Sequence, residues 1–120
     1  MPRGQVTTTG PDARVAAAAV VAADDLVVAR LLPVLDEHGI GLDVYRALRR
    51  LSDAPDGLTV GEFGRLISST PPATTRVVDR LVTEGLAYRR ADATDRRRVL
   101  VVASDAGRDL WRALVADLDA

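Results

Sequence analysis

The residues of this chain that could do chemistry are arginines and carboxylates, because most other reactive groups are missing. Among 120 residues there is no cysteine and one histidine, His38, which directly precedes Gly39. Disulfides, thiolate metal sites and cysteine nucleophiles are therefore excluded. No glycine-rich phosphate loop or nucleophile–base pair is visible, so the sequence predicts no enzyme activity, no cofactor and no metal. We expect His38 to end a helix, near the negative end of its dipole.

The arginines are unevenly distributed along the chain. All sixteen basic residues are arginine and the net charge is -1. Residues 1–45 carry three arginines against six acidic residues, whereas residues 76–98 carry seven arginines against four. A net charge of +3 thus falls within 23 residues. Arginine suits phosphates and guanine edges, so this stretch is a candidate for binding nucleic acid.

The first element that must position these residues is a long helix predicted over residues 12–37, after a flexible arm at residues 1–11. Apolar residues dominate it from Val15 to Leu35, and Pro33 is expected to kink or restart it. Because this helix lacks a polar half, we expect it to bury a second face, by default against a partner subunit. Its apolar run is too short for a membrane span, so we predict a cytoplasmic protein with no membrane partner.

The following elements are predicted from caps and periodicity. A helix is expected over Leu42–Asp53, and the capping box of Thr59 and Glu62 opens a short helix reaching Ile67. Thr70 and Pro71 read as the cap and first residue of the next helix, which ends at Gly85. A hairpin pairs Leu86–Arg90 with Arg97–Ala103, and Ser104 caps a final helix.

This order predicts a mainly α protein with a small β-hairpin, a winged helix-turn-helix. In that fold the helix after the tight turn enters the major groove and the hairpin, or wing, flanks it. Gly64 supports this prediction, because a small residue in the middle of a helix allows a second helix to approach closely.

At these residues the chain resembles the multiple-antibiotic-resistance regulator (MarR) family over about Gly39 to Leu110. The resemblance rests on the lead Gly39–Leu42 into Tyr45 and Leu48, on Thr75–Leu81 continuing to Leu86, and on the wing. The wing is the most specific part: the Asp-x-Arg motif of the family falls on Asp95 and Arg97, followed by Val99–Val102, Ser104 and Gly107. This resemblance implies a homodimeric, DNA-binding transcriptional repressor or activator, whose affinity for DNA is often relieved by a small molecule, and we expect a repressor.

The candidate DNA-binding residues lie on the predicted recognition helix and wing. Arg76 and Arg80 are four residues apart and share a helix face, where either could read a guanine. Arg97 would enter the minor groove, with Asp95 bracing that arginine or serving only as a turn former. The full set is Thr70, Ala73, Thr75, Arg76, Arg80, Arg89, Arg90, Asp95, Arg96, Arg97 and Arg98. An ordinary solvated helix face is the alternative interpretation of Arg76 and Arg80.

The chain is therefore predicted to form one domain over residues 12–120, with residues 42–103 binding DNA and residues 12–37 and 105–120 forming a dimer. The expected partner is double-stranded DNA with a palindromic site whose half-site centres lie about 10 bp apart. Three departures from the family accompany this: Thr74 in place of an aliphatic residue, Pro72 after Pro71, and a short final helix. The rival hypothesis is a winged-helix protein-interaction module that has lost DNA binding.

Overall fold

The computed structural model describes residues 11–119, without the side chains of residues 11, 12, 20, 21 and 23–25. The predicted flexible arm, residues 1–11, lies outside the described residues except for Pro11, where the first helix begins. The chain divides into two units, Met1–Pro33 and Val34–Ala120, which are described separately.

The long helix α1 (Pro11–Glu37) begins in the first unit and ends in the second. It continues through Pro33, so the expected restart of the helix does not occur. A proline removes one backbone hydrogen bond, and the turns on either side maintain the helix here. Along the first unit α1 exposes large apolar side chains, with Val15, Leu26 and Val27 between 62% and 73% exposed.

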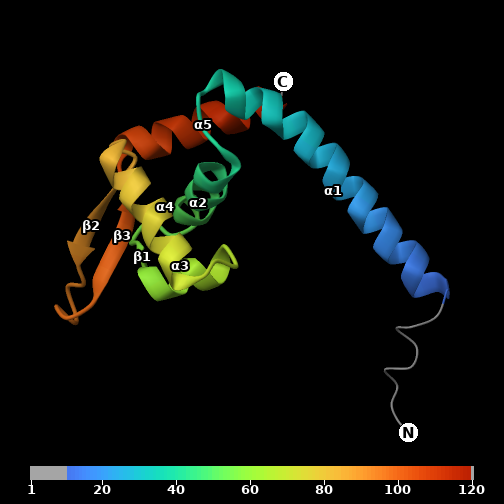
Figure 1. Cartoon of the computed structure of the whole chain (residues 1–120). Coiled ribbons are helices and arrows are strands. Elements are labelled where there is room, and N and C mark those ends of the chain that lie inside the picture. Colours follow the sequence, from blue (N-terminus) through green and yellow to red (C-terminus); the bar gives the residue numbers. More distant parts are fainter. Residues whose placement is uncertain (1–10, 120) are drawn as a thin grey trace, which may run out of the picture. The chain divides into compact units, whose positions relative to one another are not determined.

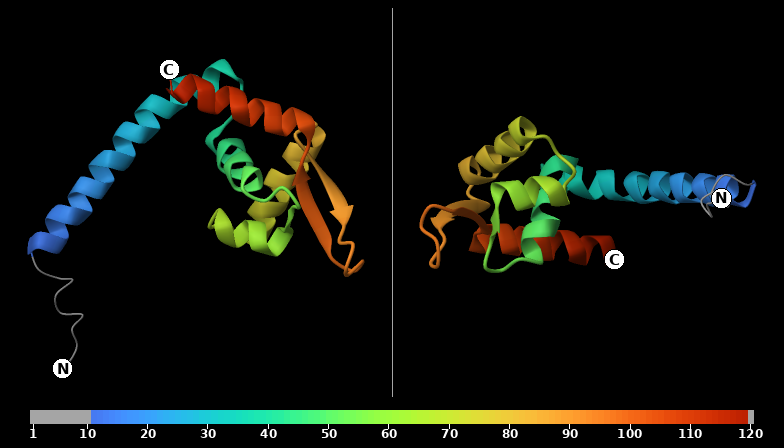
Figure 2. Two further views of the ribbon diagram at one scale, coloured as in Figure 1. Left: turned by 180° about the vertical axis from the view of Figure 1, so that it is seen from behind. Right: turned by 90° about the horizontal axis from the view of Figure 1, so that it is seen from below.

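The second unit contains the predicted helix-turn-helix in the predicted order (Figure 1). Its helices are α2 (Leu42–Ser52), α3 (Val60–Leu66), α4 (Pro71–Thr83) and α5 (Asp105–Asp119). Helices α2, α3 and α4 end within two residues of their predicted ends. The predicted fold class, mainly α with a small β-hairpin in a winged helix-turn-helix, is confirmed. α2 contacts α3, α4 and α5, so it forms the centre of this unit (Figure 2).

The sheet has one strand more than the predicted hairpin. β2 (Ala87–Ala91) and β3 (Val99–Ala103) pair antiparallel, and β1 (Leu58–Thr59) pairs with the other edge of β3. The strand order is β1-β3-β2, with Leu58 opposite Val101 and Thr59 opposite Leu100. A strand of two residues carries no alternating pattern, so the periodicity of the sequence could not reveal β1.

The core of the second unit is built from small aliphatic side chains and one phenylalanine. Helix α2 buries one face, and α4 and β3 pack residues against it that are at most 1% exposed. The largest fully buried side chains are Phe63, Leu35, Leu48, Leu51, Leu81, Leu114, Val44, Val78, Val101, Val102 and Thr74. Four aromatic residues were available in the whole chain, and the core is accordingly aliphatic.

Two close approaches depend on glycine. A Cβ at Gly64 would lie 2.8 Å from Oγ1 of Thr74, which confirms that Gly64 lets α3 and α4 come together. A Cβ at Gly107 would lie 2.1 Å from the carbonyl oxygen of Leu86, at the start of α5. Both positions therefore fix how closely α4 and α5 can pack on their neighbours.

The end of α1 and helix α2 both contact α5. His38 lies at the end of α1, as predicted, and its Nε2 is 2.6 Å from Oδ2 of Asp117. The rings of Tyr45 and Trp111 are tilted against each other with centroids 5.6 Å apart. Both aromatic residues thus pack within the chain.

Across the described part of the chain, no helix combines the length and the apolar character that a membrane span needs. Within the same residues, no group of three or more histidine or acidic side chains is placed to hold a metal ion.

Candidate nucleic-acid interface

The recognition helix α4 starts from a tight turn and a side-chain cap. Ser68, in the turn after α3, has a φ of 53°, a left-handed conformation that reverses the chain within a few residues. Thr70 then caps α4: its Oγ1 accepts a hydrogen bond from the backbone N–H of Ala73 at 3.3 Å. Pro71 and Pro72 occupy the first turn, so neither offers an N–H to a phosphate.

The threonine hydroxyls of the first turn are largely engaged within the helix. Oγ1 of Thr74 donates to the carbonyl of Thr70 at 2.8 Å, which satisfies a hydroxyl that is 1% exposed. Oγ1 of Thr75 donates to the carbonyl of Pro71 at 3.0 Å and the side chain is exposed. The polar departure at Thr74 is therefore accommodated inside the core without an unpaired group.

Arg76 and Arg80 line one cavity of about 480 Å³ between α2 and α4, as their shared helix face predicts. Arg76 is exposed, and among the described residues no hydrogen bond or ion pair holds it. Arg80 is held instead: its Nε lies 3.0 Å from Oε2 of Glu84 and its Nη1 lies 3.8 Å from Oδ2 of Asp43. The hydrogen bond that Arg80 donates to Glu84, together with the charge of Asp43, raises the pKa of Arg80 above its ordinary value.

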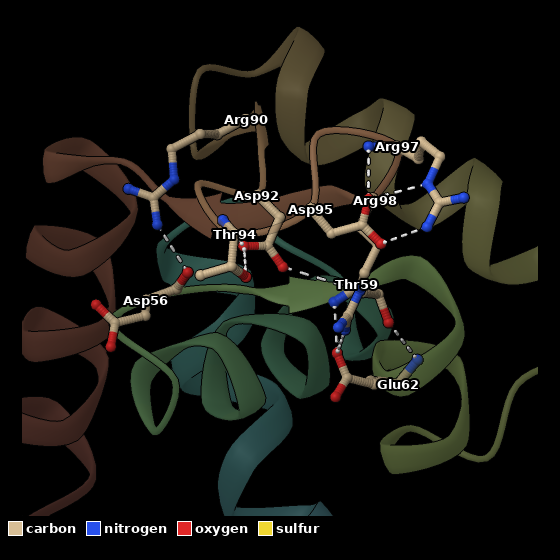
Figure 3. Close-up of polar contacts among 9 residues, drawn as sticks. All are labelled: Asp56, Thr59, Glu62, Arg90, Asp92, Thr94, Asp95, Arg97 and Arg98. Carbon is tan, nitrogen blue, oxygen red and sulfur yellow. Dashed lines mark hydrogen bonds and ion pairs between the residues drawn. The ribbon is translucent and has the colours of Figure 1, made fainter.

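At the wing tip, Asp95 braces Arg97 and also forms the turn (Figure 3). Its Oδ1 accepts hydrogen bonds from the backbone N–H and from Nε of Arg97, both at 3.1 Å. The Arg97 side chain nevertheless stays 91% exposed, so the bond orients the guanidinium without burying it. The two interpretations of Asp95 are thus combined in one residue, and the hydrogen bonds from Arg97 lower the pKa of Asp95.

A second arginine connects the wing to the start of α3. Nη2 of Arg98 lies 3.6 Å from Oε1 of Glu62 and its Nε lies 3.9 Å from Oδ2 of Asp92 (Figure 3). Glu62 is the capping-box residue: it accepts from the backbone N–H of Thr59 at 2.9 Å, and Oγ1 of Thr59 accepts from the backbone N–H of Glu62 at 3.1 Å. These hydrogen bonds with Thr59 are the main cause that lowers the pKa of Glu62.

The remaining wing arginines differ in what holds them. Arg89 of β2 forms an ion pair with Asp79 of α4, and Nη2 of Arg90 donates to the carbonyl of Asp56 at 2.9 Å. Arg96 is exposed at the tip, and no contact to another described side chain fixes it. The structure therefore divides the predicted set: Arg76, Arg96 and Arg97 are exposed and, within the described residues, form no contact with another element, whereas Arg80, Arg89, Arg90 and Arg98 each contact another element.

Sequence reasoning missed Arg46 of α2, which lines the same cavity as Arg76. The sequence shows that Arg46 lies on the polar face of α2, but it does not show that α2 packs next to α4. Among the arginines that are held by acidic side chains, Arg80 and Glu84 are four residues apart, and this spacing could have predicted their ion pair. Asp79 and Arg89 belong to different elements, so only the fold brings them together.

Comparison with known proteins gives the same architecture. The sequence model of the MarR family matches residues 38–98, about half of the chain. A search of curated proteins finds none that matches. Among solved structures, RV1404 from Mycobacterium tuberculosis has a TM-score of 0.82 at 27% identity, covering 92% of this chain and 76% of its own.

Two other similar structures were solved with ligands. The S. aureus MepR–DNA complex has a TM-score of 0.70 at 23% identity, covering 83% of this chain and 82% of MepR. CouR from Rhodococcus jostii RHA1, bound to p-coumaroyl-CoA, has a TM-score of 0.75 at 24% identity, covering 83% of this chain and 70% of CouR. The family consists of transcriptional regulators and not of enzymes. With its winged helix-turn-helix and this match, the chain belongs to the MarR family.

Proposed function

We propose that this protein is a homodimeric regulator that binds double-stranded DNA in a sequence-specific manner and represses transcription. α4 would read the major groove and the wing would contact the adjacent minor groove. The observation that carries the proposal is the pair of exposed arginines, Arg76 on α4 and Arg97 on the wing, in a winged helix-turn-helix. Since the partner is DNA, we place the protein in the cytoplasm.

The two arginines have different parts in this proposal. Arg76 is held by no other described side chain, so its fork of donors is available for O6 and N7 of a guanine. Arg97 is oriented by Asp95, and the hydrogen bond preorganises a long side chain that would otherwise lose conformational freedom on binding. Of the candidates at the start of α4, the N-cap Thr70 suits a backbone phosphate best, because its Oγ1 only accepts within the helix and, among the described residues, its O–H stays available. The N–H of Ala73 and the hydroxyl of Thr75 already donate inside the helix.

A selection from a random duplex pool tests the proposal. The expected result is an enriched inverted repeat, because two copies related by a two-fold axis read two half-sites. On the selected duplex, Arg76→Ala should weaken binding by about 1–3 kcal/mol and relax the base preference at one position in each half-site. Arg97→Ala should weaken binding to all sequences alike.

Arg112→Ala is the matched control, because Arg112 lies on α5, outside the recognition helix and wing, and pairs with Asp109 of the same helix. This variant is first compared in mass with the wild-type dimer. Its titration should match that of the wild type. Enrichment of no sequence, together with no affinity for random duplex at low salt, would contradict the proposal and favour a protein-interaction module.

A small-molecule effector is the second part of the proposal. It is supported by the cavity of about 480 Å³ beside α4 and by CouR, a structural relative solved with p-coumaroyl-CoA. Because Arg76 and Arg80 line that cavity, an occupant would compete with DNA for the same groups. Screening of small organic anions by thermal shift should find ligands that raise the melting temperature and release the selected duplex.

A further inference from the structure

The outer face of α2 carries three arginines that the recognition helix and wing do not account for. Arg46, Arg49 and Arg50 stand at i, i+3 and i+4, so neighbouring side chains on this face begin about 5–6 Å apart. With Leu66, Ile67 and Ser68 they line a hollow of about 400 Å³. Within the described residues, none of the three forms an ion pair with a carboxylate.

This arginine face is continuous with the surface of the recognition helix. Arg46, Ile67 and Ser68 line both the hollow and the cavity that contains Arg76. The turn between α3 and α4 forms the shared edge of the two. On one flank of α4, Asp79 forms an ion pair with Arg89 of the wing. On the other flank, α4 borders the cavity that it shares with Arg46 of α2.

The geometry of duplex DNA gives this second flank a natural occupant. An α-helix with its side chains is about 10–12 Å wide and the major groove is about 12 Å wide, so a sugar-phosphate backbone runs along each side of an inserted helix. The wing serves one side. On the other side, three unpaired guanidinium groups around a concave surface match a row of phosphates in charge.

We propose that Arg46, Arg49 and Arg50 form a second phosphate-binding surface, which contacts the DNA backbone on the side of α4 opposite the wing. This inference rests on the proposed DNA-binding function and extends the interface to a helix outside residues 70–98. The arginines would contribute affinity without reading sequence, since phosphates are common to all duplexes.

The test measures the salt dependence of DNA binding by fluorescence anisotropy, with full-length protein and both the selected and a random-sequence duplex. Each lost phosphate contact lowers the slope of log K against log salt by about 0.9. For Arg49→Ala/Arg50→Ala the proposed dimer loses four contacts, two in each protomer, so the slope should fall by about 3.6, equally on both duplexes, with the base preference unchanged. Arg49→Lys/Arg50→Lys should retain most of the slope, because the charges remain.

The control Arg108→Ala/Arg112→Ala removes two positive charges from α5, where each arginine pairs with an aspartate of the same helix. Because residues 105–120 are expected in the dimer, analytical ultracentrifugation must first show that this variant keeps the mass of the wild type. Melting curves confirm that each variant is folded before titration. A slope for Arg49→Ala/Arg50→Ala equal to that of the wild type or of this control would overturn the second surface and leave the proposed function intact. A wild type without salt-dependent binding would overturn both.

Discussion

The negative charge of Asp95 holds the side chain of Arg97 at the tip of the wing. Arg97 donates two hydrogen bonds to Oδ1 of Asp95 and lowers the pKa of Asp95 below the ordinary value of 3.8. A carboxylate whose pKa is lowered by folding stabilises the folded wing above its ordinary pKa, and this contribution is lost as the pH falls through the lowered value. The wing contact is therefore intact at neutral pH and weakens only in acid.

We predict that Arg97→Ala raises the pKa of Asp95 back toward 3.8, because the largest cause of its lowering is the Arg97 side chain. The pKa of Asp92 should stay low, since the hydrogen bonds from Thr94 are its main cause. Carbon-detected NMR titration of the aspartate carboxyl groups measures both in one sample. Equal movement of the two values, or movement of neither, would show that Arg97 does not hold Asp95.

At this scale the sequence predicted the elements on which the arginines lie better than it predicted the partner of each arginine. Arg76 and Arg97 were identified from the helix face and the wing motif, and both are exposed. The contact of Arg80 with Asp43 and that of Arg89 with Asp79 follow from packing between elements. A pattern along the chain does not contain those distances.

At the scale of elements, glycine positions set the packing of α3 on α4 and of α5 on the end of α4. We predict that Gly64→Ala lowers the free energy of unfolding by about 1–2 kcal/mol, because overpacking against Thr74 exceeds the gain in helix propensity. Gly107→Ala should cost about 3 kcal/mol, since its Cβ would meet the backbone carbonyl of Leu86.

Urea unfolding of these variants provides the measurement, and Gly61→Ala is the matched control on α3. A Cβ at Gly61 has its nearest neighbour at 3.7 Å, the flexible end of Arg65, so this variant should be as stable as the wild type or up to about 1 kcal/mol more stable. If Gly64→Ala were as stable as Gly61→Ala, α3 and α4 would not be limited by Thr74.

Caps and turns made the helices predictable, because Thr59, Thr70 and Ser104 act over three or four residues. The capping box and the N-cap of α4 are formed as predicted, and Oγ of Ser104 accepts from the backbone N–H of Gly107 at 3.1 Å. The strand β1 was missed because its pairing with β3 joins residues 58 and 101, far apart in sequence.

At the scale of the whole molecule, the proposed dimer gives a use to the apolar surface of α1. Leu26 and Val27 are 73% and 62% exposed, and aliphatic side chains at such exposure are typical of an association surface. We predict that Leu26→Glu converts the proposed dimer to a monomer with an unchanged far-UV circular dichroism spectrum, because it places a charge in that surface.

Analytical ultracentrifugation measures the mass, with Val99→Glu as the control for adding a carboxylate at an exposed apolar residue of the wing. That control should remain a dimer. The loss of the dimer should also weaken binding to the selected duplex, since two half-sites would then be filled separately, without the gain in affinity that comes from linking two binding modules. A monomeric wild type, or a dimeric Leu26→Glu, would contradict the assignment of α1 to assembly.

The contacts of Arg98 have a consequence for exchanging parts between regulators. Its guanidinium joins Asp92 of the wing to Glu62, and Glu62 in turn caps α3 through Thr59, a residue of the strand β1. A wing transplanted from another member of the family would thus arrive without its anchor unless residues 58–62 came with it. The exchangeable segment is discontinuous: residues 56–62 and 87–103 belong together with Asp79, the partner of Arg89, whereas Arg76 of α4 can be replaced on its own.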